Sequence, residues 1–372
     1  MNILIGIVGL ILISIILQDA FETIVLPRRV SRRFRLARLF YLVTWQLSSL
    51  IAHRIRTLTR REYFLSFYGP LSLILLLVVW AVALVLGFAM LQAGFGSAIK
   101  APENAVNFWT DFYMSGTTFF TLGLGDVTPL TPIARFITVV ESGTGFGFLA
   151  LVIGYLPINY QSFSRREIGI SLMDAHAGSP PTAAGILRRH SQGLVMPELI
   201  EHLHAWENWS AELLESHLSY PVLMYYRSQH DHQSWLAALT AILDVTALLA
   251  IGIDDVPEQR ALFTFAIACH AAIDLSQVFT LPDGVSQINR LPSSDFQRLK
   301  DQLRGMGIAL HGEDTAEQRL AELREKYEPY VIALARHLYM PLPGWLAEED
   351  SVDDWQTSAW QHEQKPTAQA RG

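Results

Sequence analysis

The chain has 372 residues, of which 51% are hydrophobic and 17% are charged, and its net charge is −7 at pH 7. This composition is too apolar for an ordinary cytosolic protein of that length. The single cysteine, Cys269, excludes an intramolecular disulfide and fits a small buried residue in a domain that faces a reducing cytosol.

Charge divides the sequence into two parts after Phe163. Residues 1–163 carry 12 Lys and Arg against 7 Asp and Glu, a net charge of +5, whereas the remainder carries 16 against 28, a net charge of −12. This contrast is typical of a membrane domain followed by an acidic soluble domain.

Residues 1–27 are predicted to form an N-terminal transmembrane helix. The apolar run that starts at Ile3 has no basic residue before it and no small-residue cleavage site after it, so a retained helix is favoured over a secretory signal. Continued to Leu26, it has about 24 residues and a length of about 36 Å. Asp19 and Glu22 share one face near its end, where we expect ion pairs with the following arginines, and a sensor role is the alternative.

Residues 28–62 are predicted to be a basic linker on the cytoplasmic side. Ten arginines lie in this short segment, and such an excess marks a cytoplasmic loop. The apolar stretch from Leu39 to Ala52 is too short to cross a bilayer, which favours an interfacial helix. A helix packed against the soluble domain is the alternative.

Residues 63–163 are predicted to hold two spans with a re-entrant loop between them. No charged residue occurs from Tyr63 to Ile99, which is enough for the outer span. The apolar segment from Asn107 to Phe120 is too short to cross the membrane and return as helix. Non-helical backbone at membrane depth must be buried in protein or line a watery cavity, so a half-crossing helix followed by Gly123 and Gly125 suits a pore loop.

The residues that follow this short helix, Thr-Leu-Gly-Leu-Gly-Asp at positions 121–126, resemble the selectivity filter Thr-Val-Gly-Tyr-Gly-Asp of potassium channels. The chain is therefore identified as similar to the bacterial potassium channel-like family, with two pore-forming helices and an extra N-terminal span. The resemblance covers residues 64–160 and implies a homotetramer, because one filter strand per chain supplies one oxygen to each ring around the ion. The ion-binding residues that it implies are Thr121, Leu122, Gly123, Leu124 and Gly125.

The resemblance also implies roles for residues around this filter. Asp126, Tyr113 and Thr117 are expected to support it, and Gly145 stands at the position of the gating hinge in the inner helix. Glu141 is a carboxylate well inside the membrane, where acids are costly and functional. We expect it to lie behind the filter, bonded to Ser115 or Thr117, and the alternative is that it faces the pore cavity.

Leu124 replaces the aromatic residue of the family's filter, and Met114 stands where the family often has tryptophan. Potassium selectivity is the favoured interpretation, with K⁺ as the permeant ion and no cofactor. A non-selective monovalent cation channel is the alternative.

Residues 164–340 are predicted to be a helical cytoplasmic domain, and residues 341–372 a disordered tail. The apolar region 235–281 is interpreted as the core of a soluble bundle, with a further membrane hairpin as the alternative. The predicted helices are Pro197 to Leu218, Ser234 to Gly252, Pro257 to Leu281, Ser293 to Met306 and Asp314 to Tyr339.

The fold class that follows is an all-α membrane protein with a pore-loop transmembrane domain and a helical cytoplasmic domain. It is expected in the cell membrane with three spans, the N-terminus outside and the C-terminus in the cytoplasm. The expected partners are the lipid bilayer and copies of the same chain, without nucleic acid, and no gating ligand is indicated. Histidines and acids gather at His217, at 230–232 and at His270 with Asp274, but their spacing predicts no metal site and no catalytic residue. A membrane-anchored enzyme or scaffold is the remote alternative.

Overall fold

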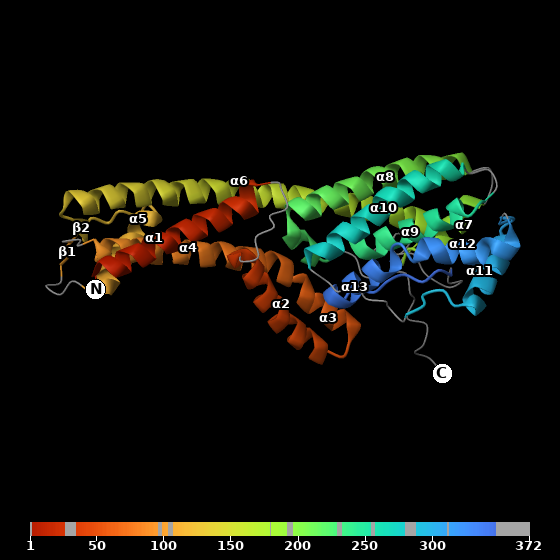
Figure 1. Cartoon of the computed structure of the whole chain (residues 1–372), viewed down its shortest axis with the longest axis horizontal. Coiled ribbons are helices and arrows are strands. Elements are labelled where there is room, and N and C mark those ends of the chain that lie inside the picture. Colours follow the sequence, from red (N-terminus) through yellow and green to blue (C-terminus); the bar gives the residue numbers. More distant parts are fainter. Residues whose placement is uncertain are drawn as a thin grey trace, which may run out of the picture. The chain divides into compact units, whose positions relative to one another are not determined.

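The computed structural model describes residues 2–26, 35–95, 99–102, 107–178, 180–191, 196–228, 233–253, 257–279, 288–310 and 312–346. The described residues are overwhelmingly helical, as the sequence predicts, and the two short strands pair with each other (Figure 1). The chain divides into two compact units, Met1–Gln161 and Ser162–Gly372.

The first unit contains the predicted outer span, short helix and start of the inner span in the expected order. Helix α6 continues across the division between the units, and the predicted boundary at 163 lies inside it. The elements are α1 Asn2–Ala20, η1 Phe21–Val25, α2 Leu36–Arg54, α3 Leu58–Ser66, α4 Tyr68–Gly94, β1 Ile99–Lys100, α5 Phe108–Phe119, β2 Thr128–Pro129 and α6 Pro132–Ala177.

Helices α1 and α4 lie against each other (Figure 1). They pack closely because glycines face each other between them. A Cβ added to Gly9 would lie 2.6 Å from the carbonyl oxygen of Gly87, and a Cβ added to Gly87 would lie 2.7 Å from Ile13 Cγ1. Small residues let membrane helices approach at this distance. The apolar core of the unit continues from this contact through Ile16 and Trp80, which are each 1% exposed.

The acidic residues at the end of α1 have two different roles. Glu22 makes the predicted ion pair with an arginine, since its Oε2 lies 3.7 Å from Arg35 Nε. Asp19 Oδ2 instead accepts hydrogen bonds from Trp80 Nε1 and from the backbone amide of Ala37, both at 3.0 Å. Asp19 therefore joins α1 to α4 and to the first turn of α2.

Helix α2 is longer than the predicted interfacial helix and rests on the start of α4. Trp45 and Tyr68 have ring centroids 4.9 Å apart, and Thr44 Oγ1 lies 3.0 Å from the hydroxyl of Tyr68. Leu39 and Leu47, on the outer side of α2, are 59% and 58% exposed. This apolar face has the character that an interfacial helix presents to lipid.

The second unit is a bundle of helices around α9. All 16 residues of α9 are buried, and α9 contacts α7, α10, α12 and α13. The sequence of α9 is apolar because this helix lies in the interior of the bundle. The remaining elements are α7 Ala183–Ser191, α8 Met196–Ser219, η2 Pro221–Tyr225, α9 Trp235–Ala250, α10 Glu258–Val278, α11 Ser293–Gly305, α12 Glu313–Arg324 and α13 Glu328–Leu338.

One buried acid in this core is fully engaged by polar partners. Asp244 is 0% exposed and accepts hydrogen bonds from Arg290 at 3.0 and 2.6 Å and from the Tyr327 hydroxyl at 2.5 Å. Glu328 lies 3.3 Å from the same arginine. The two carboxylates raise the pKa of Arg290, which therefore stays charged inside the bundle.

Two predictions for this unit are wrong. The single helix predicted from Asp314 to Tyr339 is interrupted between α12 and α13, because Pro329 lacks an amide proton and is tolerated only in the first turn of a helix. The predicted disordered tail begins too early, because Trp345 is 2% exposed and its carbonyl accepts a hydrogen bond from the Ala184 amide at 3.1 Å. Residues 347–372 lie outside the described residues.

Four helical stretches of the described residues are long and apolar enough to cross a membrane. Three of them contain the predicted spans, and the fourth is α10, which lies in the region where a further hairpin was the alternative. The described residues therefore contain one more candidate span than the three that the sequence analysis predicts. The stretches are Ile3–Val25, Leu58–Gly94, Pro132–Ala177 and Glu258–Val278.

Candidate functional site

Helix α5 begins at a capping box that the sequence analysis did not identify. The side chain of Asn107 accepts hydrogen bonds from the backbone amides of Trp109 and Thr110, and the Thr110 hydroxyl accepts one from the Asn107 amide. Such reciprocal bonds satisfy amides that a helix start leaves free. The signal was present in the sequence as an Asn three residues before a Thr.

The loop after α5 has an alternating backbone. Thr121, Gly123 and Gly125 have φ values of 58°, 53° and 79°, whereas Leu122 and Leu124 between them do not have positive φ. Glycine adopts this left-handed conformation at no steric cost, but Thr121 does so at a strain of about 1–3 kcal/mol. Where residues with positive and negative φ alternate, successive peptide groups can turn their carbonyls toward one side of the chain.

The inner end of this loop is tied to α5 through the backbone of Thr117. Its carbonyl accepts hydrogen bonds from the amides of Leu122 at 2.8 Å and of Gly123 at 3.2 Å. The Thr117 hydroxyl donates to the Met114 carbonyl at 3.0 Å. Thr117 therefore holds the loop with its main chain rather than with its side chain.

The outer end of the loop is held by a side-chain pair. The Tyr113 hydroxyl donates to Asp126 Oδ2 at 2.9 Å. Beyond this pair, β2 pairs with β1 in antiparallel register, with Ile99 opposite Pro129. Arg135 Nε also donates to the Pro129 carbonyl at 3.2 Å, which joins the outer loop to the start of α6.

Glu141 on α6 contacts α5 behind the loop. It is 0% exposed, and its Oε1 accepts a hydrogen bond from Ser115, one of the two partners predicted for it. Ser115 Oγ is also 2.8 Å from the Val85 carbonyl on α4, so α4, α5 and α6 meet at this hydroxyl. Among the described residues, Glu141 Oε2 has no hydrogen-bond partner.

Gly145 lies where α6 crosses the end of α5. A Cβ added there would be 2.0 Å from the carbonyl oxygen and 2.8 Å from the carbonyl carbon of Phe119. The absence of a side chain is therefore required for close packing of the two helices. This requirement is separate from the predicted hinge, which stays a prediction.

The candidate pore residues are largely uncovered in the single chain. Leu122 and Leu124 are each 63% exposed, and α6 carries a long exposed apolar surface. In this surface, Phe136, Val139 and Phe146 are 69%, 70% and 67% exposed. Apolar surface of this extent is normally covered by lipid or by another protein chain.

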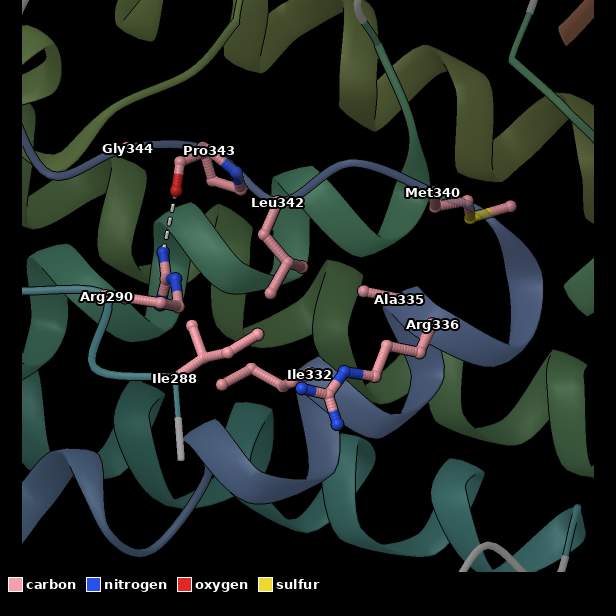
Figure 2. A pocket seen from close by; sticks show the side chains of 9 residues that line it. All are labelled: Ile288, Arg290, Ile332, Ala335, Arg336, Met340, Leu342, Pro343 and Gly344. Atoms are coloured by element: carbon pink, nitrogen blue, oxygen red, sulfur yellow. Dashed lines mark hydrogen bonds between the residues drawn. The ribbon is translucent and has the colours of Figure 1, made fainter. Parts of the chain in front are cut away.

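Other candidate sites lie in the second unit. A pocket of about 390 Å³ is lined by apolar side chains and two arginines, and Figure 2 shows Arg290 directed to the carbonyl of Pro343 across it. The charge of Arg290 is already paired with Asp244. Arg336 is the other cationic side chain in the lining of this pocket. Its apolar lining includes Ile288, Ile332 and Leu342.

Among the histidines that the sequence singled out, the structure describes His217 and His270, and each has its own partner. His217 is buried, with Nε2 3.3 Å from Arg166 Nη1, and burial beside that charge lowers its pKa well below the ordinary value. His270 pairs with Asp274 at 3.5 Å near the surface. Residues 230–232 lie outside the described residues. Three other histidines, which the sequence analysis did not single out, lie close together: His176, His190 and His202.

Comparison with known proteins finds similarity to ion channels in part of the first unit. The chain is 25% identical over 199 residues to a protein of Bacillus subtilis (strain 168) named uncharacterized membrane protein YdjJ. The match covers 52% of this chain and 56% of the relative, so the chain spans little more than half of that protein's length. No solved structure matches the chain. Residues 74–161 match the family model described as ion channel, and this confirms the resemblance to pore-loop channels over the segment that holds α5, the alternating loop and Glu141.

Proposed function

We propose that the chain is one subunit of a homotetrameric cation channel in the cell membrane. The observation that carries this proposal is the alternating backbone of residues 121–125, with positive φ at Thr121, Gly123 and Gly125. Carbonyls that point to one side of such a strand can replace the hydration shell of a cation when several strands surround it. The ion-channel family match over residues 74–161 supports the same function.

The exposed loop supports assembly of several chains. One strand covers one side of an ion, and closed symmetry is the rule when identical subunits surround an axis. A loop with Leu122 and Leu124 each 63% exposed also needs cover at membrane depth, because unpaired backbone is tolerated there only in protein or at a watery cavity. Four copies would supply both the cover and the rings of oxygens.

Potassium is the permeant ion that the filter favours. Thr121, Gly123, Gly125 and Asp126 agree with the potassium-channel motif, and the Tyr113 to Asp126 hydrogen bond provides an outer support for the strand. Leu124 lacks the hydroxyl of the family's aromatic residue and cannot make a corresponding hydrogen bond. A non-selective monovalent cation pore is therefore the second candidate.

The arginine counts support an orientation with the basic linker in the cytoplasm. Leu36–Arg54 would then lie at the inner surface of the membrane, and the second unit would follow on the same side. Burial of all of α9 by its neighbours supports a water-soluble second unit without a further membrane hairpin. The proposal assigns no catalytic step to any residue.

The filter assignment is tested by replacing its glycines. Gly123→Ala and Gly125→Ala each place a Cβ on a residue with positive φ, a strain of about 1–3 kcal/mol per subunit. We expect loss of cation flux into proteoliposomes in both variants, with unchanged insertion. Gly154→Ala is the matched control, since Gly154 is helical and has open space around an added Cβ. Unchanged single-channel current in Gly123→Ala or Gly125→Ala would refute the assignment.

A further inference from the structure

Three histidines from three helices of the second unit meet at one point. His176 lies in the last turn of α6, His190 in the last turn of α7, and His202 in α8. One nitrogen of each ring lies within 4.8 Å of the others. His202 Nε2 and His176 Nδ1 are 2.9 Å apart.

We propose that these three imidazoles bind a divalent transition-metal ion of the zinc class. Imidazole nitrogen is a preferred ligand of Zn²⁺, Cu²⁺ and Ni²⁺, whereas Mg²⁺ and Ca²⁺ prefer oxygen. Nitrogens bound at 2.0–2.1 Å to one tetrahedral ion are about 3.4 Å from one another. The cluster therefore needs side-chain adjustments of about 1 Å or less to contact one ion.

Hydrogen bonding prepares the most buried ring for such an ion. His190 is 3% exposed, and its Nδ1 lies 2.8 Å from the carbonyl oxygen of Ile186. Because a carbonyl oxygen only accepts, Nδ1 carries the proton and the lone pair is on Nε2. A backbone carbonyl that fixes the tautomer in this way is the usual outer partner of metal-binding histidines.

The surroundings leave the site reachable. The ring centroid of His202 lies 3.8 Å from that of His176 and 5.2 Å from that of His190. His176 and His202 are half-buried, which leaves one side of the cluster open for a water molecule as a fourth ligand. Glu198 and Glu201 on α8 contribute negative charge near His202, against the positive charge of Arg189 near His176.

A metal ion at this point would join the end of α6 to α7 and α8. The three residues are 14 and 12 positions apart in the sequence, from 176 to 190 and from 190 to 202, so the spacing resembles no compact metal-binding motif. Only the packing of the three helices brings them together. The proposal does not depend on ion conduction, because the cluster lies within the second unit.

The test is zinc binding by the purified full chain in detergent after chelator treatment and removal of the chelator. We expect calorimetry to give one Zn²⁺ per chain, and His202→Ala and His202→Gln to weaken binding by about 100-fold or more. His204→Ala is the control, because His204 is exposed on the same helix and is absent from the cluster. Circular dichroism checks that each variant keeps its helices, and the glutamine variant retains a side chain of similar reach.

Cobalt gives a second readout. Bound to three imidazoles and water, Co²⁺ should show the intense visible absorption of a tetrahedral site, which His202→Gln should lose. Equal zinc affinity in the wild-type chain and in the folded His202 variants would overturn the proposal. A wild-type chain that neither binds zinc nor gives a tetrahedral cobalt spectrum would also overturn it. Zinc binding is measured without ion flux, so a chain that does not bind zinc would refute the metal site and leave the channel proposal untouched. A chain that binds zinc but does not conduct ions would refute only the channel proposal.

Discussion

Gly145→Ala is expected to disturb the filter through the packing of α6 on α5. The added Cβ would lie 2.0 Å from the Phe119 carbonyl oxygen, whereas ordinary contact begins at 3.4 Å, so the helices must separate by about 1.4 Å. The obstacle is backbone, which cannot rotate away as a side chain can. The end of α5 also carries Thr117, whose carbonyl holds Leu122 and Gly123, and the separation therefore reaches the filter.

The energetic cost of this overpacking is about 1–3 kcal/mol per subunit. A change of that size shifts the equilibrium between conducting and non-conducting filters by about 5- to 150-fold, and further if every subunit of an oligomer contributes. Single-channel recording of reconstituted protein measures the effect. We expect a reduced unitary conductance or an altered potassium-to-sodium permeability ratio, while Gly154→Ala leaves both unchanged.

The same recording separates close packing from the predicted hinge. A hinge role predicts that alanine, which favours the helix by about 1 kcal/mol over glycine, changes how often the channel opens but not the current through an open channel. The packing account predicts that the open-channel current itself changes. Wild-type conductance and selectivity in Gly145→Ala would refute the packing account.

Two further predictions concern the filter and the second unit. Leu124→Tyr should leave the potassium-to-sodium permeability ratio nearly unchanged if Leu124 only fills space, and a marked rise in the ratio would show instead that the missing hydroxyl loosens the wild-type filter. Asp244→Ala should destabilise the second unit by about 3–5 kcal/mol, because it removes the closer of the two carboxylates that pair with the buried charge of Arg290 and leaves Glu328. Thermal unfolding followed by circular dichroism measures this loss, with Asp301→Ala, whose side chain is 75% exposed, as a control that should change little. Equal melting temperatures for the two variants would contradict the role given to Asp244.

The membrane unit could be predicted well from the sequence because its signals are local. An uncharged run longer than a span, a short apolar helix and a glycine-containing motif each act on their own segment, and α4, α5 and the start of α6 lie where these signals indicate. The bond between Ser115 and Glu141 was also predictable, since an acid at membrane depth must find a polar partner. Thr117 was expected to support the filter, but the sequence does not show that its backbone carbonyl is the group that accepts hydrogen bonds from the loop.

The second unit was predicted less completely because its important contacts join distant segments. Asp244 and Arg290 are 46 residues apart, and no local pattern announces the pair. The cluster of His176, His190 and His202 was missed for the same reason. Pro329 is the sequence signal for the break between α12 and α13. The signal was overlooked because the helical apolar periodicity continues on both sides of it.

If residues 121–125 line a cation pathway, the purified wild-type chain in planar bilayers must carry a cation current with a defined reversal potential. Under a potassium gradient with sodium on the opposite side, the account predicts a single-channel current whose reversal potential lies close to the potassium equilibrium value. A reversal potential near zero under these conditions would favour the non-selective cation pore. The absence of any cation current from correctly inserted protein, across the accessible range of voltage and with zinc present and absent, would contradict the account.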